Sequence, residues 1–251
     1  MRADHASIAR MFGVLIPLQP IAWTDDGMVC APRVAIDDIA HAVAMCPLPT
    51  EPTEMTHKWP DSPAALVAGW YRRSDRHASA PPGVRELVQV AGEGFGPADH
   101  ATTAMCLAAL DDLPNAPAVD AGCGSGLLAQ AWARRWAVHV LAVDLDPAAI
   151  AQTRGSSRLA GCEHLIEARR QPIEALTPDE LAARIVFANL PLPAHHTLIA
   201  RYDDPPLGVV LSGLRPAEAP AIVAAYRRMG LRHVRAARRG RFECHVLATA
   251  L

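Results

Sequence analysis

The strongest constraint on the fold is a glycine-rich turn near the middle of the chain. An apolar run ends at Asp120, Gly122, Gly124 and Gly126 follow at alternate positions, and an apolar helical pattern begins at Leu127. Glycines in such a turn let the backbone approach a ligand that any Cβ would push away. The pattern predicts a strand, a ligand-binding turn and a helix in succession. An ordinary strand–helix turn that happens to be rich in glycine is the alternative.

A second strand-like run follows at residues 138–143 and ends on an acidic side chain, Asp144. A carboxylate at this place can hold both hydroxyls of a ribose, so the two strand ends predict a nucleoside site in an α/β sheet. The spacing excludes two kinds of nucleotide site. Leu127 stands where a dinucleotide-binding turn requires a small residue, and no G-K-S/T sequence follows the glycines to hold a triphosphate.

Strands and helices alternate from residue 84 onward, which predicts βαβ units and a mostly parallel sheet. Further elements are expected along this stretch, with strands at 163–168, 184–188 and 207–212 and helices at 97–110 and 216–229. Residues 231–238 and 242–250, joined through Gly240, are typical of a closing β-hairpin. The expected architecture is therefore an α/β sheet that ends in an antiparallel hairpin.

The first 83 residues differ in sequence pattern from the rest of the chain and are expected to form an N-terminal extension to a main domain at 84–251. Helical periodicity occurs at 34–46 and again at 64–73. The prolines between these two stretches oppose regular structure and are typical of a linker or an ordered loop. The sequence Pro81-Pro82-Gly83 marks the expected boundary between the two parts.

Composition adds few constraints on function. The formal net charge is -2, so the chain as a whole is not built for nucleic acid or an anionic membrane. The cysteines form no C-x-x-C pair and have no histidine at a metal-ligand spacing, so we expect reduced thiols and no metal site. No stretch approaches the ~20 apolar residues that a membrane helix needs. These features predict a soluble, cytoplasmic protein.

The glycine turn and the acid that follows it resemble motif I and its acidic partner in class I S-adenosylmethionine-dependent methyltransferases. The resemblance implies a Rossmann-like sheet and S-adenosylmethionine as the cofactor. It implies that Asp120 and the turn glycines Gly122, Gly124 and Gly126 hold the methionine end of the cofactor. Asp144, with Leu145 beside it, is then expected to hold the ribose, and Gln171 to meet the adenine edge through its amide.

A second stretch, Gly94-Phe95-Gly96-Pro97-Ala98-Asp99-His100-Ala101-Thr102-Thr103, resembles a signature of the methyltransferases that modify lysines of large-subunit ribosomal protein eleven. Asn189 after the fourth strand and the sequence Leu211-Ser212-Gly213-Leu214 fit the same family. The resemblance covers residues 84–251. It implies that Phe95, Thr102 and Thr103 bind the cofactor and that His100 acts in catalysis. A helix start with the threonines as capping residues is the structural alternative.

Asn189 is the candidate that would meet the methyl acceptor, and the resemblance implies that it also contacts the cofactor. Amino-methylating enzymes often carry N/D-P-P-Y/F after the fourth strand, where oxygens of the motif hold the acceptor nitrogen. Leu190 and Leu192 depart from that pattern, which argues against a flat amide or base amine stacked on an aromatic ring. The alternative is a capped strand end. His195-His196 follows, and it could take a proton from an acceptor ammonium or simply begin a surface helix.

The last part of the chain is rich in arginine. The arginines at positions 227, 228, 232, 235, 238, 239 and 241 could follow RNA phosphates, or they could form a solvated hairpin face. The sequence as a whole predicts an enzyme that transfers a methyl group to a protein amine. Methylation of a small molecule or of RNA is one alternative, and a non-catalytic cofactor-binding module is another.

Overall fold

The computed structural model describes residues 18–24, 27–32, 65–74, 79–80, 82–90 and 100–249. Strands β1 (Leu18–Thr24) and β2 (Gly27–Pro32) form an antiparallel pair near the start of the chain. The helix expected at 34–46, and Phe95 with the rest of its glycine-containing stretch up to residue 99, lie outside the described residues.

A mixed sheet forms the centre of the molecule. Among the described residues it has seven strands in the order β11-β12-β10-β9-β6-β7-β8. Their bounds are β6 (Ala118–Ala121), β7 (Val140–Asp144), β8 (Ile166–Arg170), β9 (Ile185–Asn189), β10 (Gly208–Leu214), β11 (Arg232–Arg239) and β12 (Phe242–Ala248). The pairs from β10 through β9, β6 and β7 to β8 are parallel, and β12 runs antiparallel to both β10 and β11. The expected parallel sheet with a closing hairpin is confirmed.

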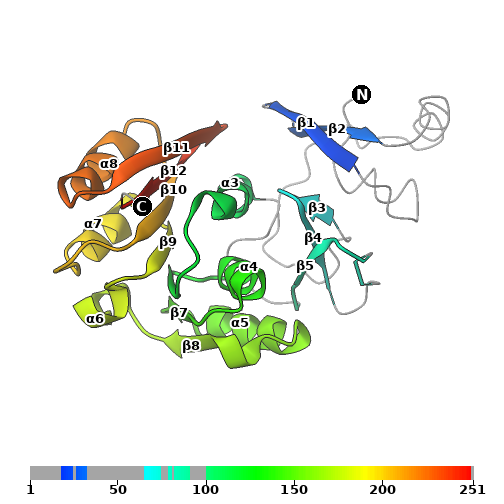
Figure 1. Cartoon of the computed structure of the whole chain (residues 1–251), viewed down its shortest axis with the longest axis horizontal. Coiled ribbons are helices and arrows are strands. Elements are labelled where there is room, and N and C mark those ends of the chain that lie inside the picture. The colour runs from blue at the N-terminus through cyan, green and yellow to red at the C-terminus, as the bar shows by residue number, and fades with distance from the viewer. Residues whose placement is uncertain are drawn as a thin grey trace.

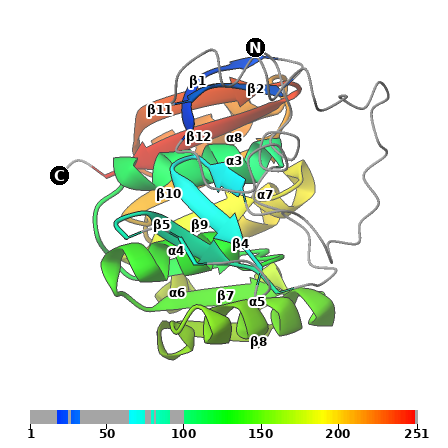
Figure 2. The ribbon, with the colours of Figure 1, turned by 90° about the vertical axis from the view of Figure 1, so that its right-hand side faces the viewer.

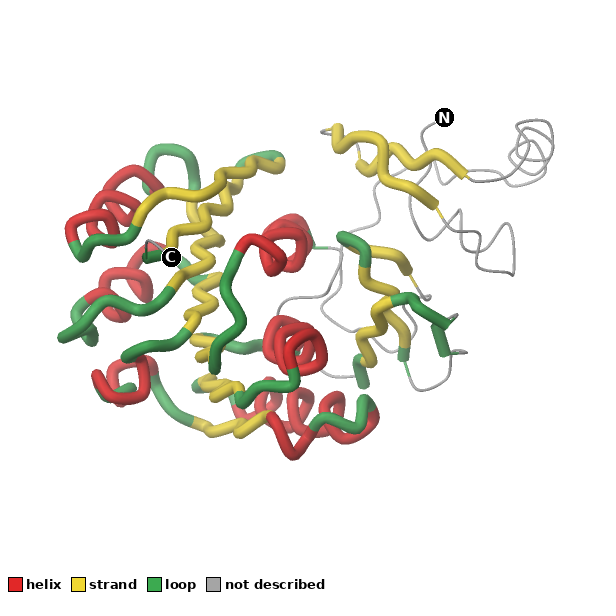
Figure 3. Tube along the Cα trace, viewed as in Figure 1, coloured by secondary structure: helices red, strands yellow, loops and turns green. Residues whose placement is uncertain are grey.

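Helices cover both faces of this sheet, as Figure 1 and Figure 3 show with the sheet seen nearly edge-on. On one face lie α3 (Ala101–Ala109), α4 (Leu127–Trp136) and α5 (Pro147–Leu159), and on the other lie α6 (Pro178–Leu181), α7 (Leu192–Ile199) and α8 (Ala219–Arg228). Short 3-10 turns precede or follow them at Leu110–Asp112, Glu163–Leu165 and Ile173–Ala175. A strand covered on both faces is apolar along its buried length, and β9 accordingly reads IVFA before it ends at Asn189.

The helix starts follow from local sequence. Asp146 caps α5 by accepting a hydrogen bond from the Ala148 backbone N–H at 2.8 Å, with proline at the first helical position. Thr177 and Glu180 satisfy each other's backbone N–H groups at the start of α6 in a reciprocal capping box. No helix among the described residues has the length and apolar run needed to cross a membrane.

A smaller sheet packs against α4 and α5. Its strands are β3 (Ala65–Val67), β4 (Trp70–Arg73) and β5 (Arg85–Val88), with β3 antiparallel and β5 parallel to β4. Figure 2 shows β4 and β5 in front of the helices. The helix expected at 64–73 is therefore wrong. Ala68 and Gly69 both have positive φ, which makes a tight hairpin turn, and the aromatic pair that follows favours a strand.

Side chains of α4 and α5 form hydrogen bonds with the backbone at the end of β5 and just after it. The Gln130 amide accepts from the Val88 N–H at 2.7 Å and donates to the Val88 carbonyl at 2.8 Å. Gln152 donates to the Val90 carbonyl, and the Ser156 hydroxyl accepts from the Val90 N–H. Since β5 pairs with β4, the boundary expected at residue 83 falls between two strands of one sheet. The division of the chain at that point stays a prediction.

Candidate functional site

The carboxyl ends of β6, β7 and β9 meet at one edge of the central sheet. The chain leaves β6 toward β7 on one side, while β9 lies on the other side of β6, so the strand order switches there. Ligands of open α/β sheets bind in the crevice that such a switch leaves. The glycine turn follows β6, Asp144 ends β7, and Asn189 ends β9. The topology therefore gathers three of the predicted site segments at one place.

The glycine turn requires glycine for reasons of conformation and space. Gly122 and Gly126 have φ of 73° and 74°, in the left-handed region that side chains disfavour. A Cβ on Gly126 would lie 2.5 Å from the Thr153 hydroxyl oxygen, and one on Gly122 would lie 2.5 Å from Leu190 Cδ2. The turn is thus packed between α5 and the segment after β9, and it presents its backbone toward the crevice.

Asp120 lies beneath this turn with only 2% of its surface exposed. Its Oδ2 accepts a hydrogen bond from the Ala129 backbone N–H in the first turn of α4 at 3.0 Å. Burial raises the pKa of this carboxyl to about 7, the Ala129 hydrogen bond opposes that rise, and the nearby Asp144 charge adds to it. Asp120 is therefore a buried acid that titrates near neutral pH.

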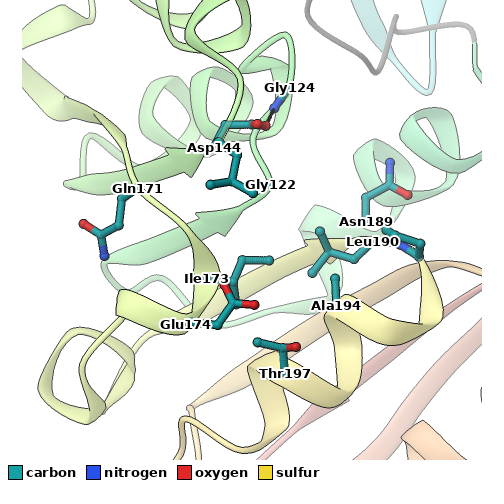
Figure 4. Close-up of a pocket in the computed structure, with 12 residues that line it drawn as sticks. Gly122, Gly124, Asp144, Gln171, Ile173, Glu174, Asn189, Leu190, Ala194 and Thr197 are labelled. Atoms are coloured by element: carbon teal, nitrogen blue, oxygen red, sulfur yellow. Dashed lines mark hydrogen bonds between the residues drawn. The ribbon is translucent and has the colours of Figure 1, made fainter.

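Asp144 connects the end of β7 to the glycine turn. Its Oδ2 accepts from the Gly124 N–H at 2.9 Å, and its Oδ1 accepts from the Asp146 N–H at 2.9 Å. Figure 4 shows the first of these bonds at the upper end of a cavity, with Gln171 at one side and Asn189 and Leu190 at the other. The carboxylate is thereby fixed in orientation at the cavity wall.

Two cavities open along this edge. The larger has a volume of about 300 Å³ and is lined by Gly122, Gly124, Asp144, Leu145, Gln171, Ile173, Glu174, Asn189, Leu190, Pro191, Ala194 and Thr197. The smaller, of about 20 Å³, is lined by Thr103, Asp120, Gly122, Cys123, Ser125, Leu127, Leu128 and Asn189. Gly122 and Asn189 belong to both linings, so the two cavities adjoin. Asp144 and Glu174 line the larger cavity, and Asp120 lines the smaller.

The remaining predicted residues divide into those that line a cavity and those that support one. Thr103 is buried in the wall of the smaller cavity, and its hydroxyl has no hydrogen-bond partner among the described residues. Thr102 is buried and bonds through its hydroxyl to Nδ1 of His100 at 2.8 Å. His100 caps α3 and lies 6.0 Å from the Phe242 ring. Neither His100 nor Gly126 is among the described residues that line the two cavities.

Several lining residues escaped the sequence reasoning. Ala194 and Thr197 lie three positions apart on α7, the spacing that places two side chains on one helix face, but nothing in the sequence indicates which face. Ile173 and Glu174 come from a short 3-10 turn with no signal of its own. His195 is fully buried on α7, so the expectation of a surface position is wrong for it, whereas His196 on the same helix is exposed as expected.

The comparisons with known proteins agree with this geometry. Residues 86–249 match the family model described as ribosomal protein L11 methyltransferase (PrmA). Relatives of that name include one from Alteromonas mediterranea, 33% identical over 71% of this chain and 62% of its own length. Another, from Aeromonas salmonicida, is 32% identical over 70% of this chain and 62% of its own. The chain thus spans about 62% of the length of the relatives it matches.

A solved structure shows the same fold. The ribosomal protein L11 methylase from Lactobacillus delbrueckii subsp. bulgaricus has a TM-score of 0.61 and 20% identity, covering 75% of this chain and 98% of that one. The family match includes the glycine turn, both strand-end residues and the closing hairpin. The resemblance expected from the motifs is therefore confirmed. This chain belongs to the ribosomal protein L11 methyltransferase (PrmA) family.

Proposed function

We propose that the chain is an S-adenosylmethionine-dependent methyltransferase that modifies an amine of a ribosomal protein. The observation that carries the proposal is the pair of adjoining cavities, with the fixed Asp144 carboxylate in the lining of the larger, Asp120 in the lining of the smaller and Asn189 in both. Membership of the PrmA family supports the same reaction. A cofactor with a ribose at its middle and an amino acid bearing an ammonium group at one end matches this arrangement, with the ribose at Asp144 and the ammonium group at Asp120.

The lining residues fit S-adenosylmethionine on several grounds. The larger cavity, at about 300 Å³, is at the lower end of the size range of small-molecule sites. In the smaller one, the Thr103 hydroxyl, which has no partner among the described residues, and the Asp120 carboxyl offer hydrogen-bond and charge partners for an ammonium group. When bound, the cofactor supplies an electrophilic methyl group on a sulfonium.

Each predicted binding residue then has a proposed role. Asp144 and Leu145 would meet the ribose, and the Gln171 amide would meet the adenine edge, aided by Ile173 and Glu174. The glycine turn and Asp120 would hold the methionine end. Thr102 and His100 would support the start of α3, from which Thr103 reaches the smaller cavity. Phe95 remains a predicted cofactor contact.

Asn189 is the residue that we assign to the acceptor. It is partly exposed and lines both cavities, so an amine held by its side-chain oxygen would lie where the two cavities adjoin. Methyl transfer is an in-line displacement, and holding the two reactants in alignment supplies much of the rate. The acceptor amine must be uncharged to attack. Asn189 favours the reaction by fixing its position.

The direct test is transfer of labelled methyl from S-adenosylmethionine into a hypomethylated extract that is then separated into protein, RNA and small-molecule fractions. Label in one ribosomal protein supports the proposal, and the Asp144→Asn variant is the control for background transfer. Label in RNA or in a small molecule refutes the acceptor assignment but retains the enzyme. Binding of the cofactor with no label in any fraction favours a non-catalytic module.

The arginines of the closing hairpin extend the proposal to a partner. Glu243 pairs with Leu214 at the carboxyl end of β10, so the hairpin turn lies at the same sheet edge as the two cavities. Arg235 is paired with Asp112, whereas Arg238 and Arg241 have no carboxylate partner within the part of the chain that the structure describes. We propose that these two contact RNA phosphates beside the acceptor protein. A cytoplasmic location stays a prediction.

A further inference from the structure

One backbone carbonyl connects three elements behind the acceptor side of the site. The Ser212 carbonyl oxygen in β10 accepts the Leu190 N–H at 3.0 Å, just after the end of β9. It also accepts the Nε2–H of His195 in α7 at 2.9 Å. The Ser212 hydroxyl in turn donates to the Glu243 carbonyl in β12 at 3.0 Å. Ser212 therefore joins the segment after β9 to α7 and to the adjoining strands.

Leu190 is held tightly between two glycines. Gly213 has a φ of 82°, and a Cβ there would collide with the backbone carbonyl of Leu190. On the other side, a Cβ on Gly122 would lie 2.5 Å from Leu190 Cδ2. Leu190 itself is buried and lines the larger cavity. The segment after β9 therefore has little room to move toward the glycine turn or toward β10.

His195 acts here as a fixed neutral donor. Its side chain is fully buried, and burial lowers its pKa, an effect that the hydrogen bond to the Ser212 carbonyl opposes. Because Nε2 donates to a carbonyl, the neutral ring carries its proton there, and Nδ1 has no partner among the described residues. An unsatisfied buried acceptor costs roughly 1–3 kcal/mol, which an apolar residue at this place would avoid.

We propose that His195 is a positioning residue for methyl transfer. Through Ser212 it holds the segment of Asn189, Leu190 and Pro191 in register, and so fixes the Asn189 amide where the two cavities meet. Asp120 and Asp144 lie on other strands. The hydrogen bonds that fix their carboxyl groups go to the backbone N–H groups of Ala129, Gly124 and Asp146, and none goes to this segment. Loss of His195 therefore changes the alignment of the acceptor more than the affinity for the cofactor. This inference rests on the proposed function.

The test compares His195→Phe, which keeps a ring but removes the donor, with His195→Gln, whose amide N–H can replace it. His196→Leu, on the exposed neighbour, is the matched control. His195→Phe should lower kcat at least tenfold and change the Kd for S-adenosylhomocysteine less than threefold. It should also speed hydrogen exchange at the Leu190 amide. His195→Gln should restore kcat to within threefold of the value for the natural chain. His196→Leu should have the same kcat as the natural chain.

Two results overturn the inference. One is that His195→Phe has the kcat of the natural chain and its Leu190 amide exchanges hydrogen as slowly as in the natural chain. The other is an equal loss of kcat and cofactor affinity that His195→Gln does not restore, which is the signature of general destabilisation. If His195→Phe does not fold, His195→Leu takes its place in the same comparison. If the natural chain methylates no acceptor, the proposed function fails, while amide exchange and Kd still test the contact.

Discussion

Asp120 offers a direct test of the site, because its environment predicts how the stability of the protein depends on pH. Burial raises its pKa to about 7, from an ordinary value of 3.8. The folded protein therefore keeps the proton between these values while the unfolded chain loses it. The stabilisation due to the protonated acid is complete below pH 3.8 and is lost as pH rises to about 7.

The size of the effect follows from the same two values. Each pH unit between them corresponds to about 1.4 kcal/mol, so the whole range corresponds to about 4 kcal/mol. Between pH 5 and pH 7 the free energy of unfolding should fall by about 2 to 3 kcal/mol on account of Asp120 alone. Asp120→Asn removes this loss, because the amide stays neutral and its oxygen can still accept the Ala129 N–H.

The assay is urea denaturation of the cofactor-free natural protein and of Asp120→Asn at four pH values from 5 to 8. The stability of the variant relative to the natural protein should increase by about 2 to 3 kcal/mol between pH 5 and pH 7 and then level off. Asp204→Asn, at an exposed position, serves as the control and should show no such trend. A difference that stays constant across this range would refute the reasoning, since Asp120 would then be ionised throughout.

Other parts of the site give shorter tests. Asp144→Ala should weaken cofactor binding more than tenfold, or by at least about 1.4 kcal/mol, and an unchanged Kd in calorimetry would remove Asp144 from the site. Gly126→Ala forces a Cβ against Thr153 at positive φ, so the free energy of unfolding in urea should fall by about 1–3 kcal/mol. A variant as stable as the natural chain would contradict the tight packing of the turn. The double change Arg238→Ala and Arg241→Ala should slow methylation of the RNA-bound acceptor and weaken its salt dependence, while turnover on the RNA-free protein stays unchanged. Equal effects on both substrates would exclude the RNA contact.

Much of the fold could be predicted from the sequence because the central strands are buried on both faces. Continuous apolar runs such as that of β9, separated by helix caps and glycines, leave few other arrangements. Residues 64–73 misled the prediction because two short strands around Ala68-Gly69 mimic a helical period. A window of this length cannot separate the two patterns without knowing that β5 will pair with β4.

The site could be predicted where it lies on strand ends and not where it depends on packing. Gly122, Asp144 and Asn189 follow strands whose parallel arrangement brings their ends together, and all three line the larger cavity. The side that α7 presents, in contrast, is set by its packing against α8 and the 3-10 turn at Ile173–Ala175 and by the bond from His195 to Ser212 in β10. The sequence predicts a polar surface position for His195, yet tertiary contacts bury it completely.

The contacts of Gln130 and Gln152 with β5 have a consequence for association of the protein. An exposed strand edge invites a strand from another chain, and proteins commonly block such edges to prevent aggregation. Here two glutamine amides and the Ser156 hydroxyl take the place of a neighbouring strand. This edge of the small sheet is therefore closed to strand addition at Val88 and at Val90 just after β5, because the backbone groups there already have partners.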